Sequence, residues 1–215
     1  MSTVVAIDGP AGAGKSTVAK LLADKMNFTY VNTGSLYRAV AWALKQADLN
    51  IEDISQQFLD NLHLEYKDGV LLVNGVDPGA ALRTADTAAG ASAVSKKDFV
   101  RSHLLPVQRD AAEKGWIVME GRDIGTVIFP DARCKFFITA GLEERAKRRL
   151  AQHGEVANGA TLEDVMRDIA CRDEQDSKRD IAPLKAAADA ITIDTGNMTP
   201  DEVVSAMERI ILERM

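Results

Sequence analysis

The sequence predicts an α/β fold in which a doubly wound, five-stranded parallel sheet carries helices on both faces. Short β-branched apolar runs alternate along the chain with amphipathic helical stretches, which is typical of parallel sheets. A glycine-rich loop joins the first apolar run to the first helical stretch. The chain has 215 residues, 46% of them hydrophobic, and shows neither a repeat nor a low-complexity linker. These features favour one large domain with an insertion.

The first fifty residues repeat the strand, loop and helix unit twice. Residues 3–7 form an apolar run that suits a strand buried on both faces, and the helix after the loop begins at Lys15. Residues 28–31 predict a second strand, and residues 35–47 a second helix with one apolar face.

The middle of the chain departs from this alternation. Two apolar runs, 63–66 and 70–74, flank an Asp68-Gly69 pair, which is a strong hairpin signal. We therefore predict a small antiparallel insertion over roughly residues 60–83. Two helices should follow, at 84–95 and 97–114, and Pro106 should kink or break the second one.

The last hundred residues return to the α/β pattern. Strands are predicted at 116–119, 134–139 and 190–195, and helices from 142, at 162–176 and from Pro200. Pro200 stands in the first turn of the last helix and is followed by two acids, as expected at a helix N-terminus.

Composition excludes several classes of protein. The net charge of −6 argues against a general binder of nucleic acid or anionic membranes. No signal peptide and no apolar stretch of membrane-spanning length is apparent. The two cysteines, Cys134 and Cys171, are far apart and predict buried thiols in a cytoplasmic protein rather than a disulfide. The three histidines show no ligand spacing.

The glycine-rich loop fits the phosphate-binding pattern G-x-x-x-x-G-K-[ST] of P-loop NTPases. Its backbone N–H groups and the start of the helix would cradle phosphate oxygens. Lys15 would reach the β- and γ-phosphates of ATP, and the Ser16 hydroxyl would bind Mg²⁺. Asp8 either orients the loop or a metal-bound water, or simply ends the strand. The predicted nucleotide-binding residues of the loop are Gly9, Pro10, Ala11, Gly12, Ala13, Gly14, Lys15, Ser16 and Thr17.

The loop alone does not separate GTPases, ATPases and small kinases. A second group of residues follows two predicted strands at their carboxyl ends, where ligands bind in an open α/β sheet. Tyr37 and Arg38 lie in the first turn of the second helix and suggest a phosphate monoester site. Glu120, Arg122 and Asp123 follow a buried strand and need charge partners or a ligand.

Two further groups of arginines are predicted, the first on the helix from residue 142 and the second on the helix at 162–176 if that helix continues to Arg179. Arg145, Arg148 and Arg149 share a face, which is either a solvated face or a phosphate clamp. Arg172 and Arg179 flank Asp176, an arrangement suited to a phosphate with a neighbouring hydroxyl or base. Phosphoryl transfer needs such positive charge and in-line positioning rather than a covalent protein intermediate. The polar residues 150–180 could form a lid that closes when both substrates bind.

Taken together, these motifs resemble the bacterial cytidylate kinases, a branch of the nucleoside monophosphate kinases. The resemblance covers nearly the whole chain. It lies in the segments IDGPAGAGKST, NTGSLYRAVA, EGRDIGTVIFPDA, EERAKRR and RDEQDSKRDIAPLKAAADAITIDT. The inserted hairpin is also similar to that family, whose acceptor region contains a small extra sheet.

The resemblance implies roles for individual residues. Ser92, Arg101 and Asp123 would read the cytosine base, and a 4-oxo group in its place would face the Asp123 carboxylate without a proton between them. It also implies an acceptor site that binds the monophosphate and the sugar, with Tyr37 in the wall of the pocket. The residues of this site would be Thr33, Tyr37, Arg38, Arg122, Arg172, Asp176 and Arg179. The transferring phosphoryl would be held by Lys15, Arg122, Arg172 and Arg179, with Arg145 and Arg149 on the donor side.

The resemblance further implies a division of the single domain, residues 1–215, into three parts. The core would comprise residues 1–35, 85–145 and 180–215, the acceptor-binding region residues 36–84, and a helical lid residues 146–179. We expect a monomer that binds ATP, Mg²⁺ and CMP or dCMP, with no nucleic acid or membrane partner.

Two alternatives remain open at this point. The chain could phosphorylate another acceptor, such as UMP, AMP or shikimate. A GTPase-like switch without a small acceptor would instead carry a guanine-reading N-K-x-D motif, which the sequence lacks.

Overall fold

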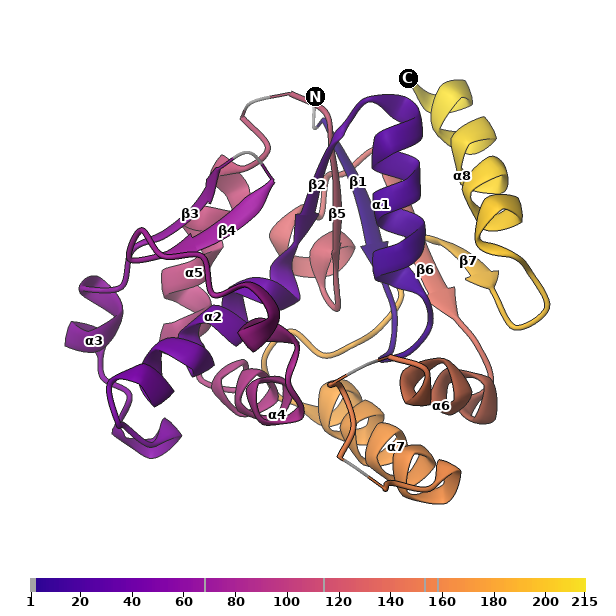
Figure 1. Cartoon of the computed structure of the whole chain (residues 1–215). Helices are drawn as coiled ribbons and strands as arrows, with labels where there is room; N and C mark the ends of the chain where they lie inside the picture. The colour runs from indigo at the N-terminus through magenta and orange to yellow at the C-terminus, as the bar shows by residue number, and fades with distance from the viewer. Residues whose placement is uncertain (1–2, 68, 114, 153, 158) are drawn as a thin grey trace.

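A five-stranded parallel sheet forms the centre of the molecule (Figure 1), as the computed structural model shows over residues 3–67, 69–113, 115–152, 154–157 and 159–215. Neighbouring strands run in the order β2-β5-β1-β6-β7, and each adjacent pair is parallel. The predicted α/β fold class is therefore confirmed. The strands are β1 (Val4–Asp8), β2 (Thr29–Asn32), β5 (Ile117–Gly121), β6 (Cys134–Thr139) and β7 (Ile191–Asp194).

The register of the sheet brings polar residues together at one edge. β1 is buried along its whole length and pairs with β5 so that Asp8 lies opposite Gly121. β2 pairs with β5 so that Asn32 lies opposite Glu120. The carboxyl ends of these three neighbouring strands thus meet at one edge, which is where α/β sheets bind ligands.

The two faces of β1 pack against different elements because side chains alternate along a strand. Val5 and Ile7 join a core with α1 (Lys15–Met26) and α8 (Pro200–Arg214), which lie side by side in Figure 1. Val4 and Ala6 face the other way, toward the π-helical turn η3 (Ile124–Ile128). Helical cover on both faces explains why the strands are continuously apolar.

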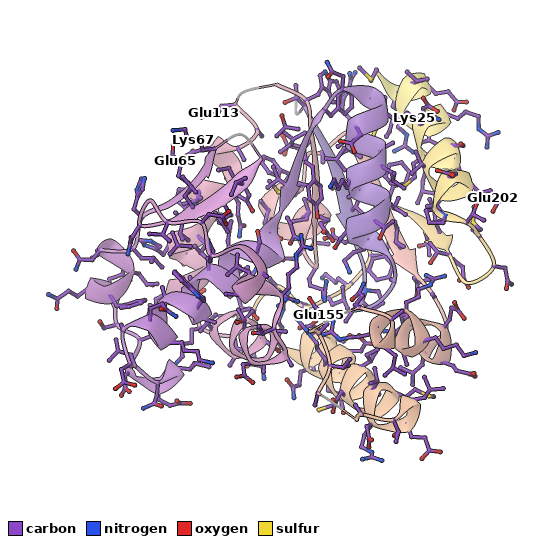
Figure 2. All side chains as sticks on the ribbon, viewed as in Figure 1. Lys25, Glu65, Lys67, Glu113, Glu155 and Glu202 are labelled. Atoms are coloured by element: carbon purple, nitrogen blue, oxygen red, sulfur yellow. The ribbon has the colours of Figure 1, made fainter. Side chains whose placement is uncertain are left out.

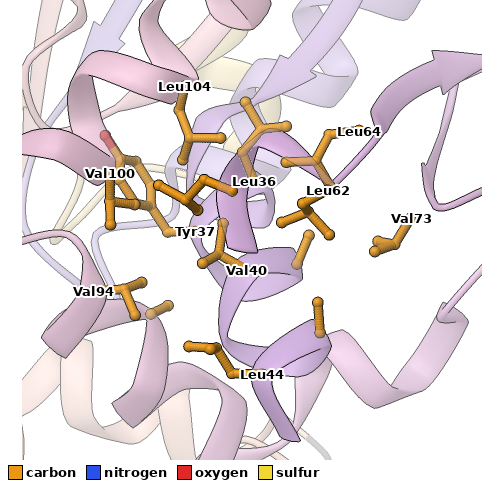
Figure 3. Packing of buried hydrophobic residues seen from close by; sticks show 14 of the residues in the cluster. Leu36, Tyr37, Val40, Leu44, Leu62, Leu64, Val73, Val94, Val100 and Leu104 are labelled. Carbon is orange, nitrogen blue, oxygen red and sulfur yellow. The ribbon is translucent and has the colours of Figure 1, made fainter. Parts of the chain in front are cut away.

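A second apolar core lies beside the sheet (Figure 3). There Leu36, Val40 and Leu44 of α2 pack against the small β3–β4 sheet and against α4 and α5. The β3–β4 hairpin confirms the predicted insertion, although Asp68 of its turn lies outside the described residues. This part of the chain consists of α2 (Thr33–Gln46), η1 (Ile51–Asp53), α3 (Gln56–Asp60), β3 (Leu64–Lys67), β4 (Val70–Val73), η2 (Gly79–Arg83), α4 (Ala85–Val94) and α5 (Asp98–Asp110).

Of the two outcomes predicted at Pro106, a kink or a break, the break does not occur. α5 runs through this residue and ends at Asp110, a little before the predicted end at 114. A proline inside a helix costs roughly 3 kcal/mol. Val100 and Leu104 are completely buried against α2, and this packing holds the helix together across the missing hydrogen bond. Three short helices, η1, α3 and η2, were not predicted because each is too short to show a period.

Helices α6 (Leu142–Leu150) and α7 (Leu162–Lys178) pack on each other around a small core of Ala146, Val165 and Ile169. Capping boxes begin both α7 and α8, at Thr161 and Thr199. Cys134 is buried as predicted, but Cys171 is exposed on α7, so its expected burial is wrong. Its helix packs through other residues, which leaves this position on the outer face. None of the helices within the described ranges has the length and apolar character needed to cross a bilayer.

Candidate active site

The glycine-rich loop is folded so tightly that two of its positions admit only glycine. Gly9 has φ of 147°, and a Cβ atom there would overlap the carbonyl oxygen of Ile138. Gly12 has φ of 75°, and a Cβ atom there would lie 2.8 Å from the carbonyl oxygen of Arg145. The loop is thus pressed against β6 and α6, with its N–H groups at the start of α1, as a phosphate cradle requires.

Lys15 is buried beneath this loop. Its Nζ atom donates a hydrogen bond to the Pro10 carbonyl oxygen at 2.7 Å. Burial and, to a smaller extent, the charge of Arg122 lower the pKa of Lys15 to about 7. A lysine in such a position gains from an anion, so the geometry suits the predicted contact with a triphosphate.

Two acids near the loop are already held by hydrogen bonds. Asp8 accepts from the backbone N–H groups of Ile124 and Gly125, each at 2.8 Å. Burial raises the pKa of Asp8 to about 6, although these two hydrogen bonds act to lower it. Asp8 therefore ends β1 and orients η3, and none of its hydrogen bonds among the described residues goes to the phosphate loop.

Glu120 is the second of these acids and is almost completely buried. It accepts hydrogen bonds from the Tyr30 hydroxyl at 2.6 Å and from the Asn32 Nδ2 at 2.8 Å. Tyr30 was not singled out from the sequence, because only the pairing of β2 with β5 brings it beside Glu120. Thr33 is also buried and donates to the Glu120 carbonyl oxygen at 2.9 Å.

These contacts decide how a magnesium ion would fit. Ser16 is exposed at the start of α1, beside the Tyr30 hydroxyl. No group of three or more acids, histidines or cysteines within the described ranges is arranged to hold a metal. Of the residues predicted to bind the metal, Ser16 offers a hydroxyl, and oxygens of the nucleotide and water would supply further ligands. Mg²⁺ is commonly bound in this way in nucleotide-binding sites, so the residues present fit the ion.

Asp123 and Arg101 form a buried ion pair. The Arg179 Nη2 lies 3.8 Å from the other carboxylate oxygen of Asp123, and the Arg101 guanidinium lies 5.8 Å from the centre of the Tyr37 ring. Burial raises the pKa of Asp123, while Arg101 and Arg179 oppose that effect. Four residues assigned to the acceptor thus come together.

Ser92 does not join this cluster through any contact of its side chain. It is half-buried on α4, and its carbonyl oxygen accepts a hydrogen bond from Ser95. Over the residues that the structure describes, no hydrogen bond of its hydroxyl is found. Gln108, which the sequence did not mark, lies close to the Tyr37 hydroxyl instead. Its place on α5, two turns after Arg101, is the signal that could have revealed it.

A second carboxylate, Asp176, draws three arginines together. The Arg122 Nε lies 3.0 Å from Asp176, and the Arg179 Nη1 lies 4.0 Å away. Burial acts to raise the pKa of Asp176, but Arg122 and Arg172 outweigh it and lower that pKa. The predicted helix does not extend to Arg179, because α7 ends at Lys178 and Arg179 follows it in extended conformation. Arg179 nevertheless lies within 4.0 Å of Asp176.

Arg172 has the least compensated charge of this group. Its Nε atom is buried and has no hydrogen-bond partner among the described residues. Burial and, to a smaller extent, the charge of Arg122 lower the pKa of Arg172 to about 10. Buried donors are normally paired, so an unpaired guanidinium beside Lys15 and Arg122 indicates a binding site for an anion.

The arginines of α6 serve different purposes. Arg145 is buried, contacts Asp173 at 2.6 Å and donates to the Ala11 carbonyl oxygen at 3.1 Å. Arg148 donates to Thr195, whose hydroxyl in turn reaches the Ala13 carbonyl oxygen at 3.1 Å. These two arginines tie α6 to the back of the loop. For Arg145 the alternative of a solvated face is wrong, because tertiary packing covers it.

Arg38 and Arg149 meet at one carboxylate, Glu155, which the sequence did not mark as functional. The two oxygens of Glu155 lie 3.0 and 3.1 Å from the two terminal nitrogens of Arg38. The Arg149 Nη2 lies 3.0 Å from the same carboxylate. The ion pair of Arg38 and Glu155 joins α2 to the segment between α6 and α7.

Comparison with protein families gives a match over nearly the whole chain. Residues 5–213 match the family described as cytidylate kinase. The chain belongs to the cytidylate kinase family. A cytidylate kinase of Thermotoga neapolitana is 43% identical over 100% of this chain and 99% of its own length. A cytidylate kinase of Bacillus anthracis is 40% identical over 97% of this chain and 95% of its own.

Comparison with solved structures supports the fold alone. An uncharacterized protein from Eubacterium ventriosum superimposes with a TM-score of 0.57 and is 17% identical in sequence. The match covers 98% of this chain and 99% of that one. The arrangement of the sheet and helices is therefore one that other proteins share.

Proposed function

We propose that this protein transfers the γ-phosphoryl group of ATP to CMP or dCMP, giving ADP and CDP or dCDP. Membership of the cytidylate kinase family supports this activity. The observation that carries the choice of acceptor is Asp123, a buried carboxylate placed between Arg101 and Arg179 at the same sheet edge as the phosphate loop.

The base would be recognised by the buried ion pair of Asp123 and Arg101. A carboxylate accepts a hydrogen bond from the 4-amino group of cytosine, and a guanidinium donates to N3 and to the 2-carbonyl oxygen. Uracil carries a carbonyl oxygen in place of the amino group. Two acceptors would then face each other in a desolvated pocket, which disfavours UMP. Tyr37 would form the pocket wall beside Arg101.

The monophosphate and the sugar would be held by the arginines around Asp176. Arg38, Arg122 and Arg179 would grip the acceptor phosphate, while Arg172 and Asp176 would contact the sugar. This concentration of fixed positive charge in a water-poor site stabilises the charge that moves with the phosphoryl group. Lys15, beneath the loop, would contact the β- and γ-phosphates of the donor, and Arg149 would join it from the lid.

Mg²⁺, held by the Ser16 hydroxyl and by phosphate oxygens, would neutralise charge on the donor phosphates. Arg145 supports the donor site from behind, because its guanidinium fixes the carbonyl oxygen of Ala11 in the loop. Thr33 has its hydroxyl bonded to the carbonyl of Glu120, so its contribution to the acceptor site would be to hold the ends of β2 and β5 together.

The division of the chain into a core, an acceptor-binding region (36–84) and a lid (146–179) belongs to the same proposal, as does a monomeric state. The small apolar core of Ala146, Val165 and Ile169 within the α6–α7 pair supports a separate lid that moves as a unit relative to the sheet. The core around α2 also contains residues of α4 and α5, so it joins the acceptor-binding region to residues 85–110.

An acceptor panel tests the proposal. ADP release is measured with CMP, dCMP, UMP, AMP and shikimate, for the wild-type protein, for Asp123→Asn and for the exposed control Asp131→Asn. The wild type and the control should prefer CMP or dCMP. In Asp123→Asn, the ratio of kcat/KM for CMP to kcat/KM for UMP should fall roughly 10- to 100-fold, since a hydrogen bond to a charged group contributes about 1.5–3 kcal/mol. Wild-type preference for UMP, AMP or shikimate would contradict the proposal.

A further inference from the structure

Glu155 lies where three parts of the molecule meet. It belongs to the segment between α6 and α7, and its side chain is only 13% exposed. Figure 2 places it in the middle of the molecule, between the α2–α4 side and the α6–α7 pair. Its two partners, Arg38 and Arg149, come from α2 and α6.

The contact with Arg38 uses both oxygens of the carboxylate and both terminal nitrogens of the guanidinium, at 3.0 and 3.1 Å. Phosphate binds arginine with the same bidentate geometry. The Nη1 of Arg38 also donates to the Leu82 carbonyl oxygen at 2.7 Å, which fixes the direction of the guanidinium. Arg38 therefore cannot hold Glu155 and an acceptor phosphate in this way at the same time.

The contact with Arg149 places the same carboxylate beside a second cation. The Arg149 Nη2 lies 3.0 Å from Glu155 Oε2 and 3.4 Å from the Glu155 carbonyl oxygen. The charges of Arg38 and Arg149 also act on Arg172. Glu155 thus brings a negative charge into a group of arginines that is otherwise suited to phosphates.

We propose that Glu155 is a positioning residue that takes the place of the acceptor phosphate on Arg38 and gives it up when the acceptor binds. This inference rests on the proposed function. A phosphate monoester carries more charge than a carboxylate and replaces it on Arg38. Displacement of Glu155 also removes it from Arg149, whose charge then becomes free to act on the transferring phosphoryl group.

Two consequences follow for the reaction. Because Glu155 is tethered to the lid, it competes with the acceptor at a high effective concentration and raises the KM for CMP. Without the acceptor, Arg149 stays neutralised, which slows attack of water on the γ-phosphorus. In that side reaction the bond from the γ-phosphorus to the bridging oxygen breaks, and ADP and inorganic phosphate form. Glu155 would therefore couple acceptor binding to completion of the arginine clamp.

The test compares Glu155→Gln, which keeps the size of the side chain but removes its charge, with wild type. Three quantities are measured on the full chain: the KM for CMP, the kcat, and ATP hydrolysis without CMP. We expect the KM to fall about tenfold, from the loss of one charged pair. ATP hydrolysis should rise several-fold, roughly in proportion to the charge freed on Arg149, while kcat changes little.

Two further variants make the result decisive. Glu143→Gln removes an exposed acid of α6 that pairs with Lys147, and it should leave all three quantities unchanged. Glu155→Asp keeps the charge but draws it back from the arginines, so it should give intermediate values. Glu155→Asp also tests the inference if Glu155→Gln does not fold.

An unchanged or raised KM with a reduced kcat would overturn the inference. That result would mean that Glu155 holds Arg38 and Arg149 in productive positions. Failure of wild type to phosphorylate CMP would instead contradict the proposed function. In that case the affinity of inorganic phosphate, measured by calorimetry, still tests Glu155: a tighter affinity in Glu155→Gln supports competition at Arg38, and an unchanged affinity overturns it.

Discussion

Lys15→Met should stabilise the folded protein at neutral pH and remove part of the pH dependence of its stability. The pKa of Lys15 is lowered from 10.5 to about 7 in the folded state, chiefly by burial. The unfolded chain therefore binds more protons than the folded one between these two values. The contribution of Lys15 to the free energy of unfolding therefore increases with pH across that window. Methionine has a similar length and no charge, so the variant lacks this contribution.

The magnitude follows from the shift in pKa. Each pH unit across the window corresponds to about 1.4 kcal/mol. Since Lys15 is half-protonated near pH 7 in the folded state, the free energy of unfolding of wild type should rise relative to Lys15→Met by about 2 kcal/mol from pH 7 to pH 9. The hydrogen bond that Lys15 donates to Pro10 is lost at both values, so its contribution largely cancels from this comparison.

Urea denaturation at pH 7 and pH 9 measures the effect, with Lys20→Met as a control because Lys20 is exposed on the same helix. Lys20→Met should follow wild type at both values. If the difference between wild type and Lys15→Met is the same at pH 7 and pH 9, the reasoning is refuted, and Lys15 keeps its proton in the folded protein. In the kinase assay, Lys15→Met should lower turnover by roughly 100-fold or more, as expected for the loss of a cation that stabilises the transferring group.

Two further variants test how the loop is held. Gly12→Ala should weaken ATP binding at least tenfold in calorimetry. The left-handed backbone alone costs on the order of 1–2 kcal/mol with a side chain, and the added Cβ would also press on α6 at Arg145. Unchanged ATP affinity would show that the loop and α6 separate easily. Thr195→Val should lower the free energy of unfolding by about 1–3 kcal/mol, because Arg148 loses its hydroxyl partner and the Ala13 carbonyl its donor. Denaturation with no loss of stability would mean that water replaces the hydroxyl.

Much of the fold could be predicted because it depends on local patterns. The strand predicted at 134–139 agrees with β6 in its bounds, and the helix predicted to begin at Lys15 agrees with the start of α1. Apolar period, glycine turns and capping residues act over a few residues and so are visible along the chain. The unbroken course of α5 through Pro106 was not predictable in this way, because burial against α2 overrides a local preference.

The candidate site divides along the same lines. Its arginines could be singled out because phosphate chemistry requires that residue type. Their partners could not: Asp8 bonds to Ile124 and Gly125 across the sheet, and Tyr30 reaches Glu120 only because β2 and β5 pair. Contacts between distant residues depend on how the elements pack, which no local pattern records.

The sequence by itself determined that the chain forms an α/β sheet with a phosphate loop and that arginines gather at its ligand-binding edge. These properties follow from residue type and spacing. Only the tertiary structure decided what each charge does: Arg145 supports the loop, Arg172 keeps an unpaired donor in the site, and Glu155 bridges Arg38 and Arg149. The reason is that the interaction of a charge depends on its distances to others and on its burial, and both are set by the packing of the whole chain.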